Sequence, residues 1–189
     1  MFEITGLNYE NTHAGQRILS VKAERFSVQR KRRGFLRLRS ENIGAFERAE
    51  ILYFLEFGED SRNESVDVEG DEHVKHNFLK HSLPLYSSGK IASYVLNPAR
   101  FFLVDNHSST RTGITSDSAI ISPEKSSIEF SGQVEAVYKN RILKTQFLIL
   151  HVEQMYMEAR EGFILTEPGS RSEGVKIKVD LFLNMLPGA

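Results

Sequence analysis

The stretch SSIEFSGQVEAVYKNRILKTQFLIL, residues 126–150, decides the fold class of this chain. Its first half alternates between apolar and polar side chains, and the apolar parity comprises Ile128, Phe130, Val134, Ala136 and Tyr138. Such a period of two is typical of a strand with one buried and one solvated face. After Asn140-Arg141, the alternation resumes with Leu143, Thr145, Phe147 and Ile149. The pattern predicts two antiparallel strands joined by a short turn.

The same alternation continues toward the end of the chain. Met155, Met157 and Ala159 share one parity, and a later run consists of Val175, Ile177, Val179, Leu181 and Leu183. The fold is therefore predicted to be all-β, with an antiparallel meander over residues 99–186. A meander favours a scaffold or a container over a catalytic parallel sheet, in which the loops that follow the strands carry the chemistry.

Residues 1–189 are predicted to form a single β domain, because a chain of this length buries roughly 70% of its unfolded surface. Short apolar runs separated by polar turns fill residues 2–57, and the turn at 29–34 ends in Gly34, as a connection between two strands would. Residues 58–98 read as a polar insertion or long loop, in which only 79–96 offers room for a short helix.

Composition narrows the classes of function. The formal net charge of −1 gives no reason to expect a nucleic-acid partner. Because the chain has no cysteine, disulfides, thiolate metal sites and cysteine nucleophiles are excluded. The sequence contains no run of 18 apolar residues, the length that a transmembrane helix needs. Its start also lacks the basic and then apolar pattern of a signal region. Two interpretations follow: a cytosolic protein, or the trimmed part of a longer chain that starts at its first strand.

Several polar clusters contain residue types used in metal binding or catalysis, but each has a simpler structural explanation. His73, His76 and His81 follow Asp71-Glu72, and these side chains are suitable metal ligands, but their spacing matches no standard site and a solvated loop is preferred. The basic run 30–33 fits a solvated hairpin tip better than contact with phosphate or lipid headgroups. No nucleophile elbow or phosphate loop is present. We therefore expect no enzymatic activity, metal or cofactor.

A short pattern recurs in the two halves of the chain. Glu3-Ile4-Thr5-Gly6 is followed by Arg17-Ile18-Leu19, and Glu129-Phe130-Ser131-Gly132 is followed by Arg141-Ile142-Leu143. Chance and a structural repeat explain this pair about equally well. A true repeat would predict a stack of equivalent strand pairs that share one apolar interior.

Three segments carry a resemblance to a known family: TGITSDSAII at 112–121, IEFSGQV at 128–134 and RILKTQF at 141–147. They resemble the OstA-like lipopolysaccharide-transport proteins, and within them the periplasmic LptC branch most. Gly132 and Val134 match the ends of that family's Gly-Asn-Val motif, with glutamine in place of asparagine, and Leu143 and Thr145 match its next segment. The resemblance covers residues 2–57 and 99–183. The sequence departs from the family pattern in having no counterpart of its N-terminal anchor helix.

The resemblance implies an open-ended, folded-over antiparallel β-jellyroll that holds lipid acyl chains in its interior. The side chains expected in this lipid-binding interior are Phe101, Phe130, Val134, Tyr138, Phe147, Ile149, Ile177 and Val179. Burying ten CH₂ groups of an acyl chain is worth roughly 8 kcal/mol, which makes such binding plausible. The implied ligand is lipopolysaccharide or a similar multi-acyl lipid, carried from the inner membrane toward the outer membrane.

The implied partners are another OstA-like β protein, paired edge to edge, and an inner-membrane transporter. The implied location is the periplasm, with anchoring to the inner membrane by a helix that this chain does not contain. The same alternation also fits a β-sandwich module with a solid core that binds carbohydrate or protein, because each inward side chain serves a core equally well. A hydrolase on a β scaffold would need convergent acids that are not identifiable in the sequence.

Overall fold

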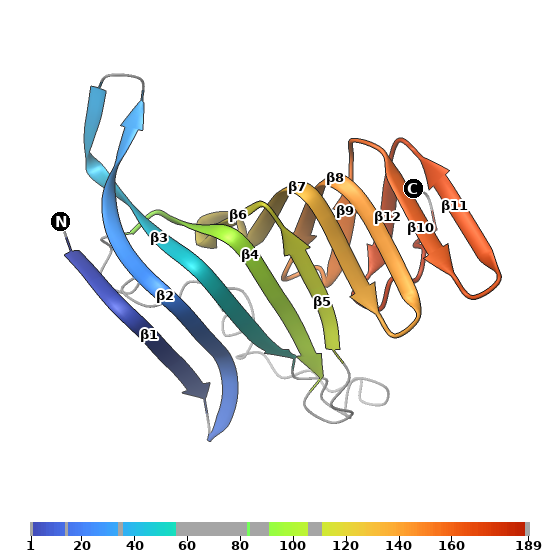
Figure 1. Ribbon diagram of the computed structural model, residues 1–189, viewed down its shortest axis with the longest axis horizontal. Helices are drawn as coiled ribbons and strands as arrows, with labels where there is room; N and C mark the ends of the chain where they lie inside the picture. Colours follow the sequence, from blue (N-terminus) through green and yellow to red (C-terminus); the bar gives the residue numbers. More distant parts are fainter. Residues whose placement is uncertain are drawn as a thin grey trace, which may run out of the picture.

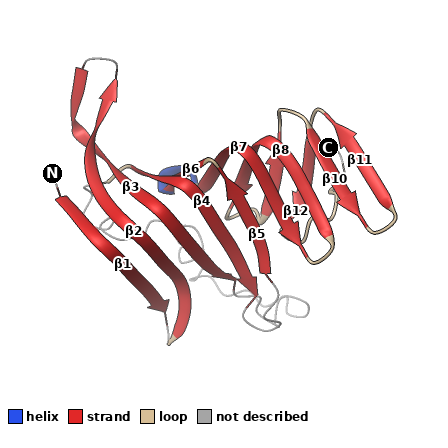
Figure 2. Ribbon diagram, viewed as in Figure 1, coloured by secondary structure: helices blue, strands red, loops and turns tan. Residues whose placement is uncertain are grey.

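The computed structural model describes residues 2–13, 15–33, 36–55, 83, 91–105 and 111–187. Within them the chain is built almost entirely of strands (Figure 2). The strands are β1 (Phe2–His13), β2 (Gln16–Arg33), β3 (Leu36–Leu55), β4 (Ser93–Asp105), β5 (Arg111–Ser116), β6 (Ser118–Ser122), β7 (Ser127–Tyr138), β8 (Arg141–His151), β9 (Tyr156–Ala159), β10 (Phe163–Glu167), β11 (Ser170–Gly174) and β12 (Ile177–Asp180). One 3₁₀ turn, η3 (Pro123–Lys125), separates β6 from β7. The predicted all-β class is confirmed.

The strands form one large sheet with the order β1-β2-β3-β4-β5-β7-β8-β10-β11 (Figure 1). β6 pairs with β4 and β7, whereas β9 pairs with β8 and β12. The pairs are antiparallel except for β3 and β4, which run parallel from Ile43↔Ser93 to Leu55↔Asp105. The expectation of a purely antiparallel jellyroll is therefore wrong at this pair, because a long connection returns the chain to the start of the next strand.

The predicted insertion over 58–98 ends earlier than expected. β4 starts at Ser93, and Tyr94 and Leu96 are fully buried core residues. Leu83 and Ile91, on either side of an undescribed stretch, also belong to the core. The rest of the insertion, including the histidines at 73, 76 and 81, lies outside the described residues, and so does most of the segment that was expected to have room for a helix.

Each long strand is interrupted where the sheet folds over. The fold line, as we call this row, runs through Gly6, Glu24, Arg48, Pro98, Asp117, Gly132-Gln133 and Gln146. Regular pairing skips these positions, and β7 gains one residue relative to β8 between Ser131 and Val134. Gly6 and Gly132, the glycines of the recurring pattern, both lie on this line with φ of +67° and +74°.

The fold line also shifts the inward parity. In four strands the spacing of inward residues changes there from two to three: Ala23 and Phe26, Phe46 and Ala49, Leu96 and Ala99, Thr145 and Leu148. A single parity for a whole strand therefore fails after the fold line. This shift corrects two sequence assignments, because Leu148 and Leu150 join the core cluster in place of Phe147 and Ile149.

Folding over gives the second half of the sheet two layers. The front layer consists of β5, residues 134–138 of β7, residues 141–145 of β8, β10 and β11. The rear layer consists of β6, residues 127–131 of β7, residues 147–151 of β8, β9 and β12. Figure 1 shows β9 and β12 behind β8 and β10. The buried apolar side chains gather between these layers and continue along β2–β4.

Candidate lipid-binding interior

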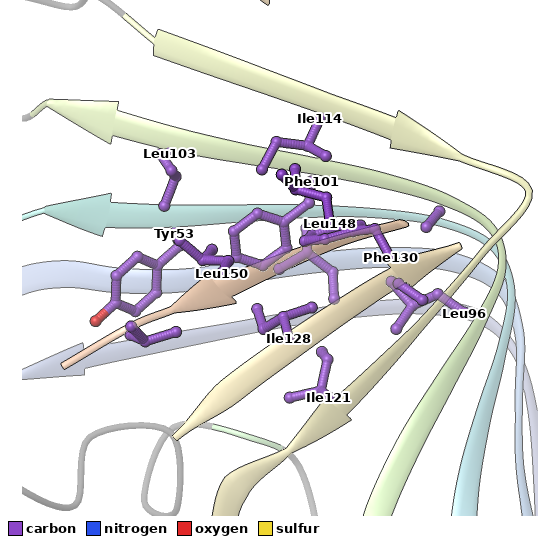
Figure 3. Packing of buried hydrophobic residues seen from close by; sticks show 14 of the residues in the cluster. Tyr53, Leu96, Phe101, Leu103, Ile114, Ile121, Ile128, Phe130, Leu148 and Leu150 are labelled. Atoms are coloured by element: carbon purple, nitrogen blue, oxygen red, sulfur yellow. The ribbon is translucent and has the colours of Figure 1, made fainter. Parts of the chain in front are cut away.

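Five of the side chains expected in the interior meet there. Phe101, Phe130, Val134, Ile177 and Val179 all belong to the core cluster, and none exposes more than 2% of its surface. The rings of Phe101 and Phe130 are 5.9 Å apart in an edge-on arrangement, and Tyr53 lies 6.5 Å from Phe101 on the other side (Figure 3). Strands β3, β4, β7 and β12 thus contribute to one continuous apolar interior.

The bulge in β7 explains how Phe130 and Val134 both face this interior. Gly132 and Gln133 lie between them with positive φ, at +74° and +45°. This pair turns the strand at the fold line, so that the segment before it enters the rear layer and the segment after it enters the front layer. A Cβ on Gly132 would lie 2.4 Å from Oδ2 of Asp117, so glycine is required there for space as well as for φ.

The other expected interior residues occupy the margin or the outer face. Tyr138 is partly buried and its ring lies 5.2 Å from Phe182. Phe147 is half-buried outside the core cluster, and Ile149, although 7% exposed, is also outside it. Val175 was expected to begin the last inward run but is 76% exposed, because β12 starts only at Ile177.

Sequence reasoning missed several interior residues. Ile114, Leu148, Leu150 and Leu165 are almost completely buried, and Figure 3 shows Leu148 and Leu150 beside Phe101 and Phe130. The sequence did indicate that the inward parity is ambiguous here. The run Phe147–Leu150 is apolar at every position, so alternation alone does not say which of its residues face inward. The bulge opposite, at Gly132, decides which parity is inward.

The family-motif positions have clear structural roles. Leu143 is fully buried in the front layer, opposite Ala136. Thr145 Oγ1 donates a hydrogen bond of 2.6 Å to the carbonyl oxygen of Gly162, which lies between β9 and β10. Since Gly162 is where the chain passes from the rear to the front layer, this hydrogen bond fixes the fold line at β8.

The interior is closed in this structure. Phe101, Phe130, Val134, Ile177 and Val179 pack within the core cluster, and each exposes 2% of its surface or less. One surface depression lies over the fold line, where Lys22, Arg48 and Arg100 are among its lining residues.

A buried charge lies on the outer face of the rear layer. Glu158 is 2% exposed, and its carboxylate accepts hydrogen bonds from Arg160 at 2.7 Å and makes an ion pair with Lys176 at 2.9 Å. The Arg160 hydrogen bond, aided by Lys176, lowers the pKa of Glu158 to about 2 against the opposing effect of burial. His151 Nε2 lies 3.7 Å from this carboxylate, and burial lowers the pKa of the imidazole. These contacts tie β9 to the start of β12.

The ends of the strand order offer backbone groups for pairing. Among the described residues, β1 pairs with β2 alone and β11 pairs with β10 alone. β1 presents Ile4, Leu7 and Tyr9 to the core as partly buried side chains. An edge strand with free N–H and C=O groups can accept a strand of another protein.

The described residues contain neither a candidate metal site nor a candidate membrane-spanning helix. They contain no cluster of three or more histidine, aspartate or glutamate side chains suited to a metal ion. Helices long and apolar enough to cross a bilayer are likewise missing from the described part of the chain.

Comparison with known proteins identifies the family. A search of curated proteins returns no match to this chain. The family model described as "Lipopolysaccharide-assembly, LptC-related" matches residues 86–186, which include β4 to β12 and every strand of both layers. This match covers more than half of the chain and agrees with the motif positions around Gly132 and Thr145. The chain therefore belongs to the LptC-related family and has a role in lipopolysaccharide transport.

Proposed function

We propose that the protein is a non-enzymatic carrier that binds lipopolysaccharide, or a similar multi-acyl lipid, by its acyl chains between the front and rear layers. It works in the periplasm, held at the inner membrane, and passes lipid toward the outer membrane. The observation that carries this proposal is the continuous apolar interior lined by Phe101, Phe130 and Val179, inside the region that matches the family. Apolar walls of this extent suit acyl chains, whose burial yields about 0.8 kcal/mol per CH₂.

The unpaired edges support the proposed handover to a partner. β1 has twelve residues and β11 five, and each ends the strand order among the described residues. A neighbouring β protein that adds a strand to either edge would extend the sheet, and at β11 it would extend the front layer. The proposed partners are therefore an inner-membrane transporter at one edge and another protein of this fold at the other.

A second function is favoured by the packing itself. Because the interior side chains are closed against each other, the domain also fits a protein-interaction module with a solid core that never admits lipid. The two functions differ in one respect: only a carrier brings acyl chains into contact with Phe101 or Phe130.

Adjacent phenylalanines provide a matched test. Phe101 faces the interior, whereas Phe102 is partly exposed on the opposite face, with the Arg111 guanidinium 4.8 Å from its ring. Replacing either one by p-benzoylphenylalanine places a photocrosslinker of the same size on the two sides of β4. We expect lipopolysaccharide to be crosslinked from position 101 and not from 102. Equal capture from both positions, or none from 101, would reject the carrier and leave the solid-core module.

The edges are tested in the same way. Glu3 lies in β1 at the end of the strand order, and Glu50 lies in β3, which is paired on both sides. A photocrosslinker at position 3 should capture a β-protein partner in bacterial cells, while one at position 50 should not. Capture from position 50 alone would exclude strand addition at β1.

A further inference from the structure

The chain that follows β12 folds back on itself. We call residues 181–186 the strap. Asp180 organises its turn, because Oδ1 accepts hydrogen bonds from the backbone N–H groups of Phe182 at 2.8 Å and Asn184 at 2.9 Å, and Oδ2 accepts one from the Asn184 side chain. Leu183 adopts a positive φ of +59° within this turn. The turn reverses the chain and brings Met185 beside β12.

The strap covers the outer edge of β12. Val179 and Met185 form an antiparallel bridge, and the Leu186 N–H donates to the carbonyl oxygen of Lys178 at 2.9 Å. The Asp180 N–H donates to the carbonyl oxygen of Asn184 at 2.9 Å. The Lys178 C=O and the Asp180 N–H and C=O are therefore already used by the strap, in contrast to the edge at β1.

The strap also connects the two layers on the side away from the fold line. It leaves β12 in the rear layer and touches the front layer at both β5 and the β7–β8 turn. Thr112 Oγ1 donates a buried hydrogen bond of 2.6 Å to the carbonyl oxygen of Leu181. Arg141 donates to the carbonyl oxygen of Phe182 at 3.2 Å and also to the Asn184 side chain, while Tyr138 packs on Phe182. Leu181 and Leu183, 3% and 0% exposed, lie in the core cluster between the layers.

The strap therefore both covers the edge of β12 and holds the two layers together. A strand that adds to β12 must displace Asn184 and Leu186, because the Asn184 C=O and the Leu186 N–H already bond the backbone groups of Asp180 and Lys178. Layers that part on this side must release Leu181 and Leu183. Since these residues are neighbours in the strap, removal of one pair loosens the other.

We propose that the strap is a displaceable closure that couples strand addition at β12 to opening of the interior. The partner it fits is a β-strand from another protein, which takes the place of residues 184–186 beside β12. Only the second step, opening of the interior for lipid, rests on the proposed lipid-carrying function. Displacement by a strand stands independently of lipid.

A reversible disulfide between the strap and β12, called the lock below, tests whether release of the strap is needed for lipid binding. In the bridge between Val179 and Met185 the hydrogen bonds come from the flanking residues, so the pair is of the non-hydrogen-bonded type, whose short Cα–Cα distance suits a disulfide. The chain has no cysteine, so within one molecule the variant Val179→Cys/Met185→Cys can form only this bond, and the monomer is isolated before the measurement. Binding of lipopolysaccharide is measured with the same sample oxidised and then reduced. We expect oxidation to weaken binding at least tenfold.

The outcomes separate the two hypotheses. Equal binding by the oxidised and reduced forms would overturn the closure and leave the carrier function standing. Failure of the reduced form and of the unmodified protein to bind lipid would overturn the carrier function, and with it the lipid half of the closure. Matching circular dichroism of both forms shows that the lock leaves the fold intact.

A labelling experiment tests strand displacement without lipid. Leu183→Cys places a thiol where the side chain is fully buried, and Met185→Cys places one where it is 53% exposed. The probe strand is a synthetic peptide with the sequence of residues 2–13, the edge strand β1. We expect the peptide to raise the maleimide labelling rate of Leu183→Cys at least fivefold, toward that of Met185→Cys. An unchanged rate at saturating peptide would overturn displacement.

A variant outside the strap checks the same mechanism. Thr112→Val keeps the side-chain shape and removes the hydrogen bond to Leu181. We expect Leu183→Cys to be labelled several-fold faster in this background without any peptide. No acceleration, together with an unchanged melting temperature, would show that the strap is not held by the front layer and would overturn the coupling.

Discussion

The backbone N–H of Asp117 donates a hydrogen bond of 2.9 Å to the carbonyl oxygen of Gly132, and the Asp117 side chain fills the space where a Cβ on Gly132 would lie. The two residues belong to different positions of the fold line, one between β5 and β6 and the other inside β7. Their contact joins the bends of neighbouring strands, so that the sheet folds as a unit.

Replacing Gly132 by alanine should destabilise the protein. The new Cβ would lie 2.4 Å from Oδ2 of Asp117, and a φ of +74° strains any residue with a Cβ. We expect a loss of about 2–4 kcal/mol, measured by urea unfolding. Gly169→Ala is the matched control, because its φ is +78° but no atom lies within 4 Å, so it should lose only about 1 kcal/mol. Equal losses would show that Asp117 yields without cost.

The parity shift in β8 predicts opposite responses from neighbouring positions. Leu148→Asp places a carboxylate among the apolar side chains of the core cluster and should unfold the protein or cost at least about 4 kcal/mol. Phe147→Asp places the same group at a half-buried site on the other face and should cost about 1–2 kcal/mol. Thermal unfolding of both variants measures the difference. A reversed order would restore the parity expected from alternation alone.

Removing the buried charge should cost stability at neutral pH. Glu158→Gln loses the charge-assisted hydrogen bond to Arg160 and the ion pair to Lys176, and we expect a loss of about 2 kcal/mol. Glu173→Gln is the control, because Glu173 and Arg171 are both exposed and 3.6 Å apart, and it should change stability by less than about 0.5 kcal/mol. Both values come from urea titrations at pH 7.

The stabilising effect of Glu158 should vanish in acid. Its pKa in the folded protein is about 2, below the ordinary value of 4.5, so the unfolded chain binds the proton more readily. The contribution is therefore complete above pH 4.5 and is lost as the pH falls toward 2. Unfolding of the protein and of Glu158→Gln at a series of pH values should show the gap between them closing in this interval. A constant gap would mean that the charge of Glu158 is not responsible.

His151 should titrate below its ordinary value of 6.5. Burial is the main cause of the lowered pKa, the neighbouring Arg160 also lowers it, and Glu158 acts in the opposite direction. Removing that charge in Glu158→Gln should therefore lower the pKa of His151 further. The imidazole shifts in an NMR pH titration measure both values. A pKa above 6.5, or a rise in the variant, would contradict this account.

Local alternation predicted much of the fold, because burial on one face of a strand imposes a period of two. Phe101, Phe130, Val134, Ile177 and Val179 were placed inward correctly for this reason. Alternation failed at Phe147 and Ile149, because a bulge in the partner strand β7 determines which residues of β8 face inward. The sequence of β8 alone does not show where that bulge lies. The parallel pairing of β3 with β4 was missed because register between distant strands leaves no local signal.

The fold line sets a length scale for transport. The long strands β1–β4, β7 and β8 cross it and the shorter strands lie on one side of it, so the apolar space runs along the crease, perpendicular to the strands. Nine strands lie side by side along it. At about 4.8 Å per neighbouring pair, the described sheet reaches about 38 Å in this direction, twist neglected. Longer strands would deepen the crease without extending it. A carrier of this shape gains reach only by adding strands, and a path many times longer requires further copies of the fold joined end to end.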